Sequence, residues 1–385
     1  MTAGKTIIVL GGGIGGIVAA TQLRKQLPTE HRIILVERES RFAFSPSFPW
    51  LMVGKRRAKN ITRTRTKLSK LGVELIQGDI EKIDASQRKV RVNGKELSAD
   101  YLLIALGAEM APETIPGLSE AGHTYYTLEG AEKLNLARQE FHAGRLVLMV
   151  STLPFKCPAA PLEGVLLLEN DCRKRGIRQD VQIDLYTPEP GPMSLTGPEN
   201  SRALRKIVEA KGITYHPEHA VTKVDPDSKR IHFANDTTAD FDLLVYVPPH
   251  RAPQVVRDAG MTGESGWIPV DKYTMATKYP NVYAIGDVTG IKLNVGKPLP
   301  KAGVIAHGEA EVVVNNLVQE ITGNGAPTKF NGHGECFVEI GGGKAGLGRG
   351  NFYAEPKPVM KLYKPGYVMH WGKVAFEKYW LFKWF

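Results

Sequence analysis

The chain has 385 residues, 42% of them hydrophobic, and its 50 Lys and Arg against 40 Asp and Glu give a formal net charge of +10. This length predicts two domains and a tail, and no stretch of 18 uncharged apolar residues is present to form a membrane-spanning helix. Three cysteines without a CxxC pair argue against a metal site or a disulfide-stapled fold, and no RNA-binding signature points to a nucleic-acid partner.

The N-terminal segment predicts a dinucleotide site. Met1 to Lys5 lead directly into an apolar strand at 6–10, without a signal peptide. The glycine loop GGGIGG follows at 11–16, then a helix at 17–26 and a second strand that ends in Glu37. This order is the dinucleotide fingerprint, in which the glycines let a pyrophosphate approach the helix N-terminus and the acid binds a ribose hydroxyl. The alternative is a glycine turn that merely packs helix on strand.

The remaining segments predict a second α/β unit and a third part. Residues 73–80, 89–92 and 96–99 suggest a small antiparallel excursion, and 100–108 a buried strand that ends in glycine. The second unit contains predicted strands near 146–150, 182–186 and 243–247 and a helix near 201–211. A strand at 281–287 and a helix at 303–321 follow. We therefore expect an α/β fold with two Rossmann-like domains, divided as 1–111 with 275–329, 112–274, and a C-terminal region 330–385.

The loop after the strand at 146–150 departs from a nucleotide-binding pattern. A second dinucleotide unit would carry its glycine loop here, but the sequence reads STLPFKCPAAP over 151–161. Proline has a fixed φ and no N–H, so this turn cannot hold a pyrophosphate with backbone amides. Cys157 stands between these prolines, which suggests that electrons enter through sulfur instead of a nicotinamide. The alternative for Cys157 is a small buried apolar residue.

Three motifs together resemble the flavoproteins with two dinucleotide-binding domains: the glycine loop with Glu37, YLLIALGA at 101–108, and NVYAIGDV at 281–288. The resemblance implies FAD, with Asp287 bonding the ribityl chain. The residues expected to bind this cofactor are Gly11, Gly13, Gly16, Glu37, Ile80, Gly107, Gly286, Asp287 and Gly303.

Within that group the chain resembles the sulfide:quinone oxidoreductases, whose close relative is flavocytochrome c sulfide dehydrogenase. The specific pieces are FKCPAAP with Glu163, LPKAG at 299–303, and a lone Cys336 followed by Phe337. The resemblance implies that Cys157 and Cys336 form a redox pair on one flavin face, with Lys301 near the flavin ring. It favours Cys336 as the cysteine that attacks the flavin.

The chain also departs from the family. The third cysteine of many members is absent near 125–127, and none lies near 42–46 where some members attach FAD, so FAD is expected to be non-covalent. Cys172, in a helix with charged neighbours, is interpreted as structural. His307 is interpreted in the same way.

The chemistry expected of the pair is thiol–disulfide exchange. Sulfide near neutral pH is largely HS⁻, which would open a disulfide to give a persulfide and a thiolate. Lys156, Lys301 and the N-terminus of the helix that begins near Pro161 would keep a thiolate ionised. Glu163 either moves a proton or caps that helix. The alternative for Lys301 is an exposed lysine without a role.

The tail suggests a membrane interface. Six aromatics lie within 376–385, separated by lysines, and as a helix Phe376, Tyr379, Trp380, Lys383 and Trp384 share one face. The alternative is a tail folded onto the core or another subunit. The net positive charge fits either an ordinary surface or attraction to anionic lipid or substrate. Phe337, by resemblance, and Tyr363 and Trp371 are candidate quinone contacts.

The function expected is oxidation of sulfide to polysulfide or sulfur, with electrons passed to a quinone, by a peripheral (monotopic) membrane protein that either is monomeric or forms a homo-oligomer. The alternatives are a type II NADH:quinone oxidoreductase, a sulfide dehydrogenase with a haem acceptor, and a flavin redox sensor without turnover.

Overall fold

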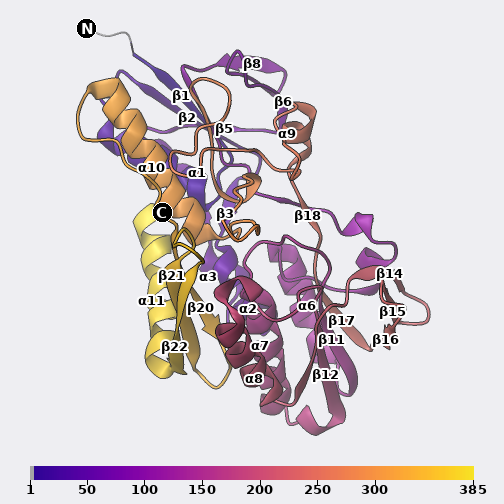
Figure 1. The fold of residues 1–385 in the computed structure, drawn as a ribbon. Coiled ribbons are helices and arrows are strands. Elements are labelled where there is room, and N and C mark those ends of the chain that lie inside the picture. The colour runs from indigo at the N-terminus through magenta and orange to yellow at the C-terminus, as the bar shows by residue number, and fades with distance from the viewer. Residues whose placement is uncertain (1–3) are drawn as a thin grey trace.

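The computed structural model describes residues 4–385. Its N-terminal unit is built on a five-stranded parallel sheet, and we call this sheet with its helices and loops the first layer (Figure 1). The strand order is β19-β9-β1-β2-β5. The strands are β1 (Thr6–Leu10), β2 (Arg32–Glu37), β5 (Glu74–Gln77), β9 (Tyr101–Ile104) and β19 (Val282–Ala284). Helices α1 (Ile14–Gln26) and α10 (Gly303–Thr322) pack against each other and share one hydrophobic cluster with β1. A strand that is apolar along its length, as β1 is, suits this position because both of its faces are covered.

One predicted segment belongs to a different sheet. Residues 74–77 pair in parallel with β2 and form the edge of the main sheet, so their assignment to the antiparallel excursion was wrong. The excursion itself consists of β6 (Ile80–Asp84), β7 (Lys89–Val92) and β8 (Lys95–Ser98). No residue of β5 is fully buried, and a partly exposed edge strand has the mixed pattern of an antiparallel strand.

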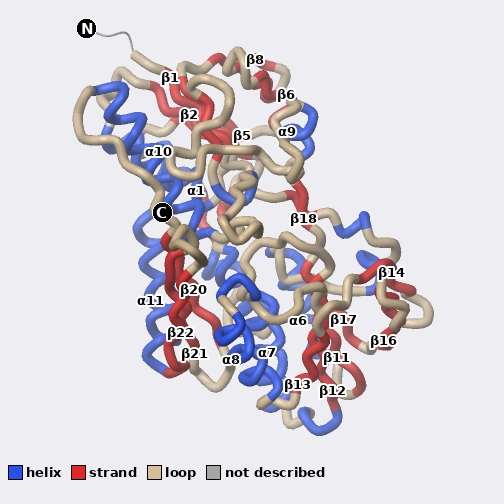
Figure 2. Tube along the Cα trace, in the orientation of Figure 1, coloured by secondary structure: helices blue, strands red, loops and turns tan. Residues whose placement is uncertain are grey.

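The second layer is a four-stranded parallel sheet in the order β13-β12-β11-β17 (Figure 2). Its strands are β11 (Gly144–Val150), β12 (Val181–Tyr186), β13 (Ile213–His216) and β17 (Leu243–Val247), which confirms the three predicted strands. Its helices are α6 (Leu128–Glu140), α7 (Ala160–Lys174) and α8 (Pro198–Glu209). A small antiparallel sheet of β14 (Val221–Asp225), β15 (Arg230–Phe233) and β16 (Thr238–Asp240) lies beside it.

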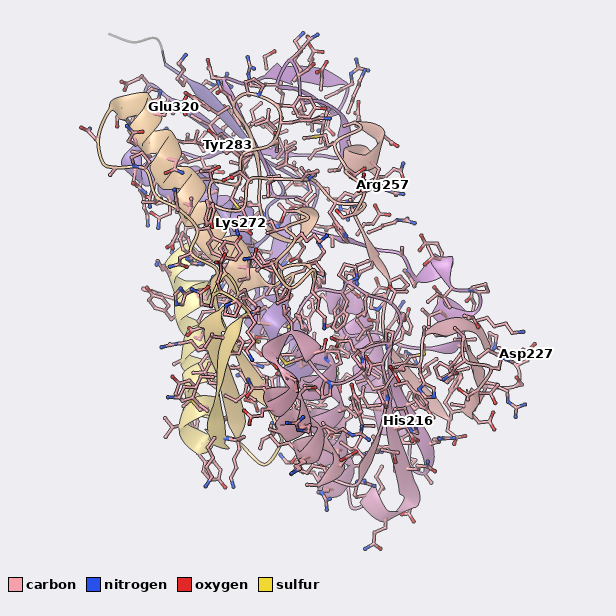
Figure 3. All side chains as sticks on the ribbon, viewed as in Figure 1. His216, Asp227, Arg257, Lys272, Tyr283 and Glu320 are labelled. Atoms are coloured by element: carbon pink, nitrogen blue, oxygen red, sulfur yellow. The ribbon has the colours of Figure 1, made fainter. Side chains whose placement is uncertain are left out.

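Polar side chains link elements within each layer, and two of them, His216 and Glu320, are labelled in the side-chain view (Figure 3). In the second sheet His216 contacts the fully buried Asp184 at 2.8 Å, which joins β13 to β12. In the first layer Tyr101 donates to Glu320 of α10 at 2.9 Å. These groups are satisfied within their own layers, which is the usual condition for polar side chains in a core.

The C-terminal part is a three-stranded antiparallel sheet followed by one helix. The strands are β20 (His333–Glu339), β21 (Ala345–Asn351) and β22 (Val359–Gly366), and the helix is α11 (Tyr367–Trp384). Trp380, Leu381 and Trp384 are buried in the first hydrophobic cluster, and Trp380 stacks on Phe42 at 4.9 Å. The predicted membrane stripe that contained Trp380 and Trp384 is therefore wrong, because these residues anchor α11 to the core. Among residues 4–385, no helix has the length and apolar character needed to cross a membrane.

Short elements complete the chain. They are β3 (Arg41–Ala43), β4 (Thr62–Thr64), β10 (Glu109–Met110), β18 (His250–Arg251), α2 (Phe48–Met52), α3 (Ala58–Ile61), α4 (Thr66–Lys70), α5 (Leu118–Ala121) and α9 (Gln254–Asp258), with five short 3-10 turns, among them η5 (Gly286–Val288). The antiparallel pair β10 and β18 lies where the chain leaves the first layer and returns to it.

Candidate active site

The glycine loop after β1 has the geometry of a dinucleotide cradle. Gly11 has a φ of +98°, and a Cβ on Gly16 would lie 1.9 Å from the Gly11 carbonyl oxygen, so both positions require glycine. A Cβ on Gly13 would meet nothing within 4 Å, which leaves the N-terminus of α1 open to a ligand. Glu37 accepts a hydrogen bond from the Gly12 amide at 2.6 Å and so lies beside the loop.

The buried polar groups around this loop also fit a bound flavin nucleotide. Within residues 4–385 the Asp287 carboxylate accepts no hydrogen bond, and burial raises its pKa. Arg65 is buried beside the loop, bonds the Gly12 carbonyl at 3.1 Å, and leaves its Nε without a partner. Polar atoms with little access to water are normally hydrogen-bonded, so the half-buried Asp287 carboxylate and the unpaired Arg65 Nε fit the hydroxyl and phosphate groups of a flavin nucleotide.

The other residues expected at the cofactor lie at the edges of this space. Gly286 has a φ of +75° and Gly107 a φ of +66°, values that favour glycine. Gly303 begins α10, and a Cβ there would lie 2.5 Å from the Ile14 side chain, so the two helices start in close contact. Ile80 begins β6 and is only half-buried.

Lys301 is buried and holds the loop of Asp287. Its Nζ donates to the carbonyl oxygens of Asp287 at 2.6 Å and Thr289 at 3.0 Å, and lies 3.3 Å from the centre of the Trp267 ring. Burial lowers the pKa of Lys301 to about 8. The alternative of an idle exposed lysine is therefore wrong.

Cys157 and Cys336 come together from the second layer and the C-terminal sheet. Cys157 lies in the loop before α7, where its amide donates to the Lys301 carbonyl at 2.7 Å, and Cys336 lies in the middle of β20. The neighbouring Cys336 thiol is the largest influence that lowers the pKa of Cys157, and the same proximity raises the pKa of Cys336. The Cys336 thiol itself donates to the Phe337 carbonyl oxygen at 3.4 Å. Cys157 also has a φ of +57°, a left-handed conformation that non-glycine residues adopt at a cost and that occurs often at functional sites.

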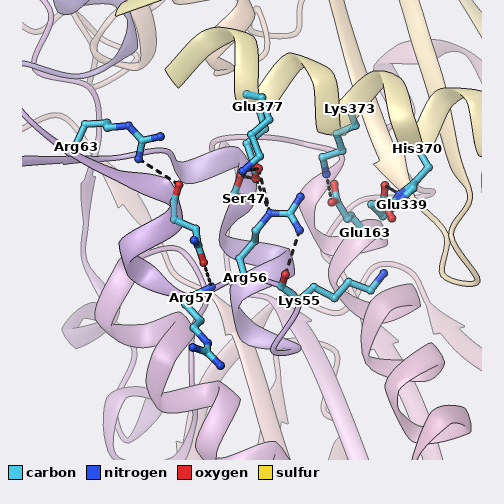
Figure 4. Close-up of polar contacts among 12 residues, drawn as sticks. Ser47, Lys55, Arg56, Arg57, Arg63, Glu163, Glu339, His370, Lys373 and Glu377 are labelled. Atoms are coloured by element: carbon cyan, nitrogen blue, oxygen red, sulfur yellow. Dashed lines mark hydrogen bonds and ion pairs between the residues drawn. The ribbon is translucent and has the colours of Figure 1, made fainter. Parts of the chain in front are cut away.

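A buried ion pair lies next to the two thiols. Glu163, in the first turn of α7, pairs with Lys373 of α11, and both side chains are at most 7% exposed (Figure 4). Desolvation raises the pKa of Glu163, although Lys373 opposes this shift. The positive charge of Lys373 lowers the pKa of Cys157, whereas Glu163 raises it. Because the Glu163 carboxylate bonds Lys373 and makes no cap hydrogen bond, its predicted alternative as a helix cap is wrong.

Sequence reasoning missed the polar inner face of α11. His370 contacts Glu339 of β20 at 2.7 Å, and Glu377 accepts from Ser47 at 2.5 Å and from Arg56 at 3.0 Å (Figure 4). His370, Lys373 and Glu377 are spaced by three and four, so they share one side of the helix. That spacing was a readable signal, but the number of aromatic residues in the tail obscured it.

Glu309 was also missed. It is fully buried in α10, where one carboxylate oxygen accepts from the Gly286 amide at 2.6 Å and the other has no partner within residues 4–385. Burial raises its pKa to about 8. Glu309 lies three residues after Ala306 and four before Val313, so it falls on the apolar side of the helix, and that position was the available signal.

Two of the three quinone candidates share a row. Phe337, Leu347 and Tyr363 are register partners across β20, β21 and β22, and the Phe337 ring lies against Gly372 of α11. Neighbouring residues on a strand point to opposite faces, so Phe337 and Cys336 face opposite sides of β20. Trp371 is 66% exposed on the outer side of α11.

Cys172 is buried, and its pKa is raised to about 11 by burial. His307 contacts Glu311 at 3.4 Å on the same helix.

Comparisons with known proteins give a consistent picture. A family model described as "Pyridine nucleotide-disulphide oxidoreductase" matches residues 5–150 and 176–310, so its gap contains the Cys157 loop and all of α7. A mitochondrial sulfide:quinone oxidoreductase of Mus musculus is 28% identical over 91% of this chain and 79% of its own. A sulfide-quinone reductase of Aquifex aeolicus is 28% identical over 98% and 91%. The X-ray structure of the Aquifex aeolicus sulfide:quinone oxidoreductase has a TM-score of 0.89 at 27% identity, covering 99% of this chain and 91% of that one.

Proposed function

Because the chain belongs to the pyridine nucleotide-disulphide oxidoreductase family, we propose that it oxidises sulfide at Cys157 and Cys336 and reduces a quinone through bound FAD. The proximity of these two thiols carries the proposal: α7, which Cys157 precedes, packs against β20, which contains Cys336, and each thiol shifts the pKa of the other. The similarity to sulfide:quinone oxidoreductases over nearly the whole chain supports the same substrates.

The sulfur step is a thiol–disulfide exchange. In the oxidised enzyme, HS⁻ attacks one sulfur of the Cys157–Cys336 disulfide, so that a new S–S bond forms, the original one breaks, and the second cysteine leaves as a thiolate. The products are a cysteine persulfide and a thiolate, and the proton of HS⁻ stays on the persulfide or passes to a base. When bound, FAD supplies the two-electron acceptor between this pair and the quinone.

The surrounding residues control charge at the pair. Lys373 favours the thiolate of Cys157 by its positive charge, and the half-buried Lys156, whose pKa is lowered by desolvation, lies close enough to Cys157 to interact with its charge. Glu163 has a raised pKa beside the thiols, which suits a carboxyl that takes up and releases a proton. Lys301 holds the Asp287 loop in position.

Several finer features belong to the same proposal. FAD is non-covalent, because no cysteine lies near the glycine loop or in 42–46. The protein associates peripherally with a membrane through the outer face of α11, and the quinone approaches the row of Phe337, Leu347 and Tyr363. The domain boundaries are 1–111 with 275–329, 112–274 and 330–385.

An anaerobic titration of the yellow holoenzyme tests the proposal. Sulfide is expected to bleach the flavin absorbance stoichiometrically, and decylubiquinone is expected to restore it over many turnovers. NADH at the same concentration is expected to leave the absorbance unchanged, because no second glycine loop is present to bind it. Bleaching by NADH, or no bleaching by sulfide, would contradict the proposal.

A further inference from the structure

The outer face of α11 is an uncovered apolar stripe. Val368, Trp371, Tyr379 and Phe382 are 80%, 66%, 59% and 79% exposed, and their spacing of three to eight residues places them along one side of the helix. Figure 1 shows α11 at the outer edge of the molecule beside β20–β22. Exposed aromatic and aliphatic side chains in a row are unusual for a surface that faces water only.

Three lysines lie along this stripe. Lys67 of α4 donates to the Phe382 carbonyl at 3.2 Å and lies 5.7 Å from the centre of its ring, so the basic segment 54–70 lies beside the C-terminal end of α11. Lys378 and Lys383 are on α11 itself, and Lys383 lies 5.5 Å from the centre of the Tyr379 ring. We call this set of three the lysine rim: Lys67, Lys378 and Lys383.

The rim is not neutralised by the protein. Residues 54–70 contain no acid, and residues 357–385 contain only Glu377. Glu377 is buried, and Ser47 and Arg56 already bond its carboxylate. Lys378 reaches Glu377 only at 3.6 Å, and within residues 4–385 the other rim lysines form no ion pair with a carboxylate. The charge around the stripe is therefore positive and available to an external anion.

We propose that the lysine rim binds the headgroups of anionic phospholipids while the stripe on α11 enters the outer part of the acyl region. The inference rests on the membrane association in the proposed function and adds the lipid class. An apolar helix face gives weak, reversible attachment, and a basic cluster at headgroup level supplies the second contribution that stable attachment requires. The rim lies beside the stripe, so both contacts form at the same depth of one bilayer surface.

Vesicle binding of the FAD-loaded enzyme tests the proposal. Phosphatidylcholine vesicles are compared with vesicles that contain about a third phosphatidylglycerol. The wild-type enzyme is expected to bind the anionic vesicles at least about tenfold more tightly, and 0.5 M salt is expected to remove most of this difference because the Debye length falls to a few Å. Sulfide-driven reduction of a water-soluble quinone serves as the control for folding.

Two variants separate the rim from the stripe. The double variant Lys378→Gln with Lys383→Gln is expected to weaken binding to anionic vesicles by about fivefold for each lysine, with little change for neutral vesicles. Phe382→Ala is expected to weaken binding to both kinds. Lys223→Glu is the matched control, because Lys223 is exposed on β14, which lies on the opposite side of the molecule from α11 (Figure 1).

The outcomes distinguish this inference from the proposed function. Equal binding to both vesicle types would overturn the lysine rim and leave the membrane association standing. Binding to neither would overturn both. A loss of binding in Lys223→Glu as large as in the double variant would also overturn the rim, because net charge alone would then explain the preference.

Discussion

The loops after β1 and after β11 occupy equivalent positions in two parallel sheets, but they have different chemistry. The first, Gly11 to Gly16, keeps its glycines and leaves open space at the N-terminus of α1. The second, Ser151 to Cys157, leads into α7, and the cavity at the ends of its strands measures about 10 Å³, enough for one water molecule. One strand–turn–helix geometry therefore supports a nucleotide cradle in one layer and a thiol in the other.

The second loop is held by contacts that a nucleotide loop does not need. The Cys157 amide donates to Lys301, and the Cys157 carbonyl accepts from Ala160 as α7 begins. These bonds occupy the amides of Cys157 and Ala160, and free amides are what a nucleotide loop offers to a phosphate. Lys301 in turn holds the loop of Asp287, which is expected to bind the flavin nucleotide. The loop after β11 therefore differs from the glycine loop in that its backbone is bonded to the first layer.

Removal of either thiol is expected to give the largest effect. Cys157→Ser and Cys336→Ser should each lower sulfide-driven quinone reduction by at least about a thousandfold, because a hydroxyl cannot form the disulfide that HS⁻ attacks. Flavin absorbance after gel filtration should stay at the wild-type level, since neither residue lies in the glycine loop. High activity in both variants would show that the second loop carries no redox chemistry.

At the glycine loop after β1, a substitution is expected to lower stability and FAD content, unlike the cysteine substitutions. Gly16→Ala places a Cβ 1.9 Å from the Gly11 carbonyl oxygen, so α1 must shift and the free energy of unfolding should fall by about 2–4 kcal/mol, with loss of FAD. Gly13→Ala is the matched control for the backbone clash, because its Cβ meets no protein atom, so the unfolding midpoint of the FAD-free protein should stay unchanged. Urea unfolding and the absorbance at 450 nm measure both. A Gly16→Ala protein with wild-type stability and FAD content would contradict the assignment of the loop Gly11 to Gly16 as the nucleotide cradle.

Replacing one or the other member of the ion pair beside Cys157 should shift the pKa of its thiol in opposite directions. Lys373→Met removes a charge that lowers the pKa of Cys157, so the thiolate should form at higher pH, whereas Glu163→Gln should let it form at lower pH. Each shift is expected to be on the order of one pH unit. The pH dependence of Cys157 alkylation in the reduced enzyme, followed by mass spectrometry, measures it.

Each single change also leaves a buried charge without its partner, at a cost of about 3–5 kcal/mol. The double variant Glu163→Gln with Lys373→Met is therefore the folding control, and its alkylation midpoint should lie between those of the single variants. Shifts of the same sign in both single variants would contradict the electrostatic explanation.

Local patterns predicted the parts of the molecule that local physics determines. The strand at 6–10, its glycine loop and the helix after it form one continuous segment, and each step has a backbone requirement that the residue types reveal. Cys157 was found because prolines exclude a phosphate site at that turn. Its partner Cys336 came from a family resemblance, since no spacing in the chain connects the two.

The contacts of α11 were beyond such patterns. Lys373 and Glu163 meet only where α11 of the C-terminal part packs against α7 of the second layer, so neither residue carries a local sign of the other. The aromatic residues of the tail also serve two purposes, since Trp380 and Trp384 pack in the core while Trp371 and Phe382 face outward. Composition detects aromatic residues but does not divide them between two faces of a helix.

Cys172→Ser gives the smallest expected effect and separates helix α7 from the chemistry at its start. Cys172 lies on the same helix that Cys157 precedes, but it is 2% exposed in the second hydrophobic cluster, and burial raises its pKa to about 11. A thiol of this kind stays protonated and unreactive at neutral pH. Replacing it with a buried hydroxyl should lower the free energy of unfolding by about 1–2 kcal/mol and leave sulfide oxidation within about twofold of wild type. A loss as large as that of Cys157→Ser, with FAD retained, would mean that the redox pair includes Cys172 and that the loop after β11 has a structural role.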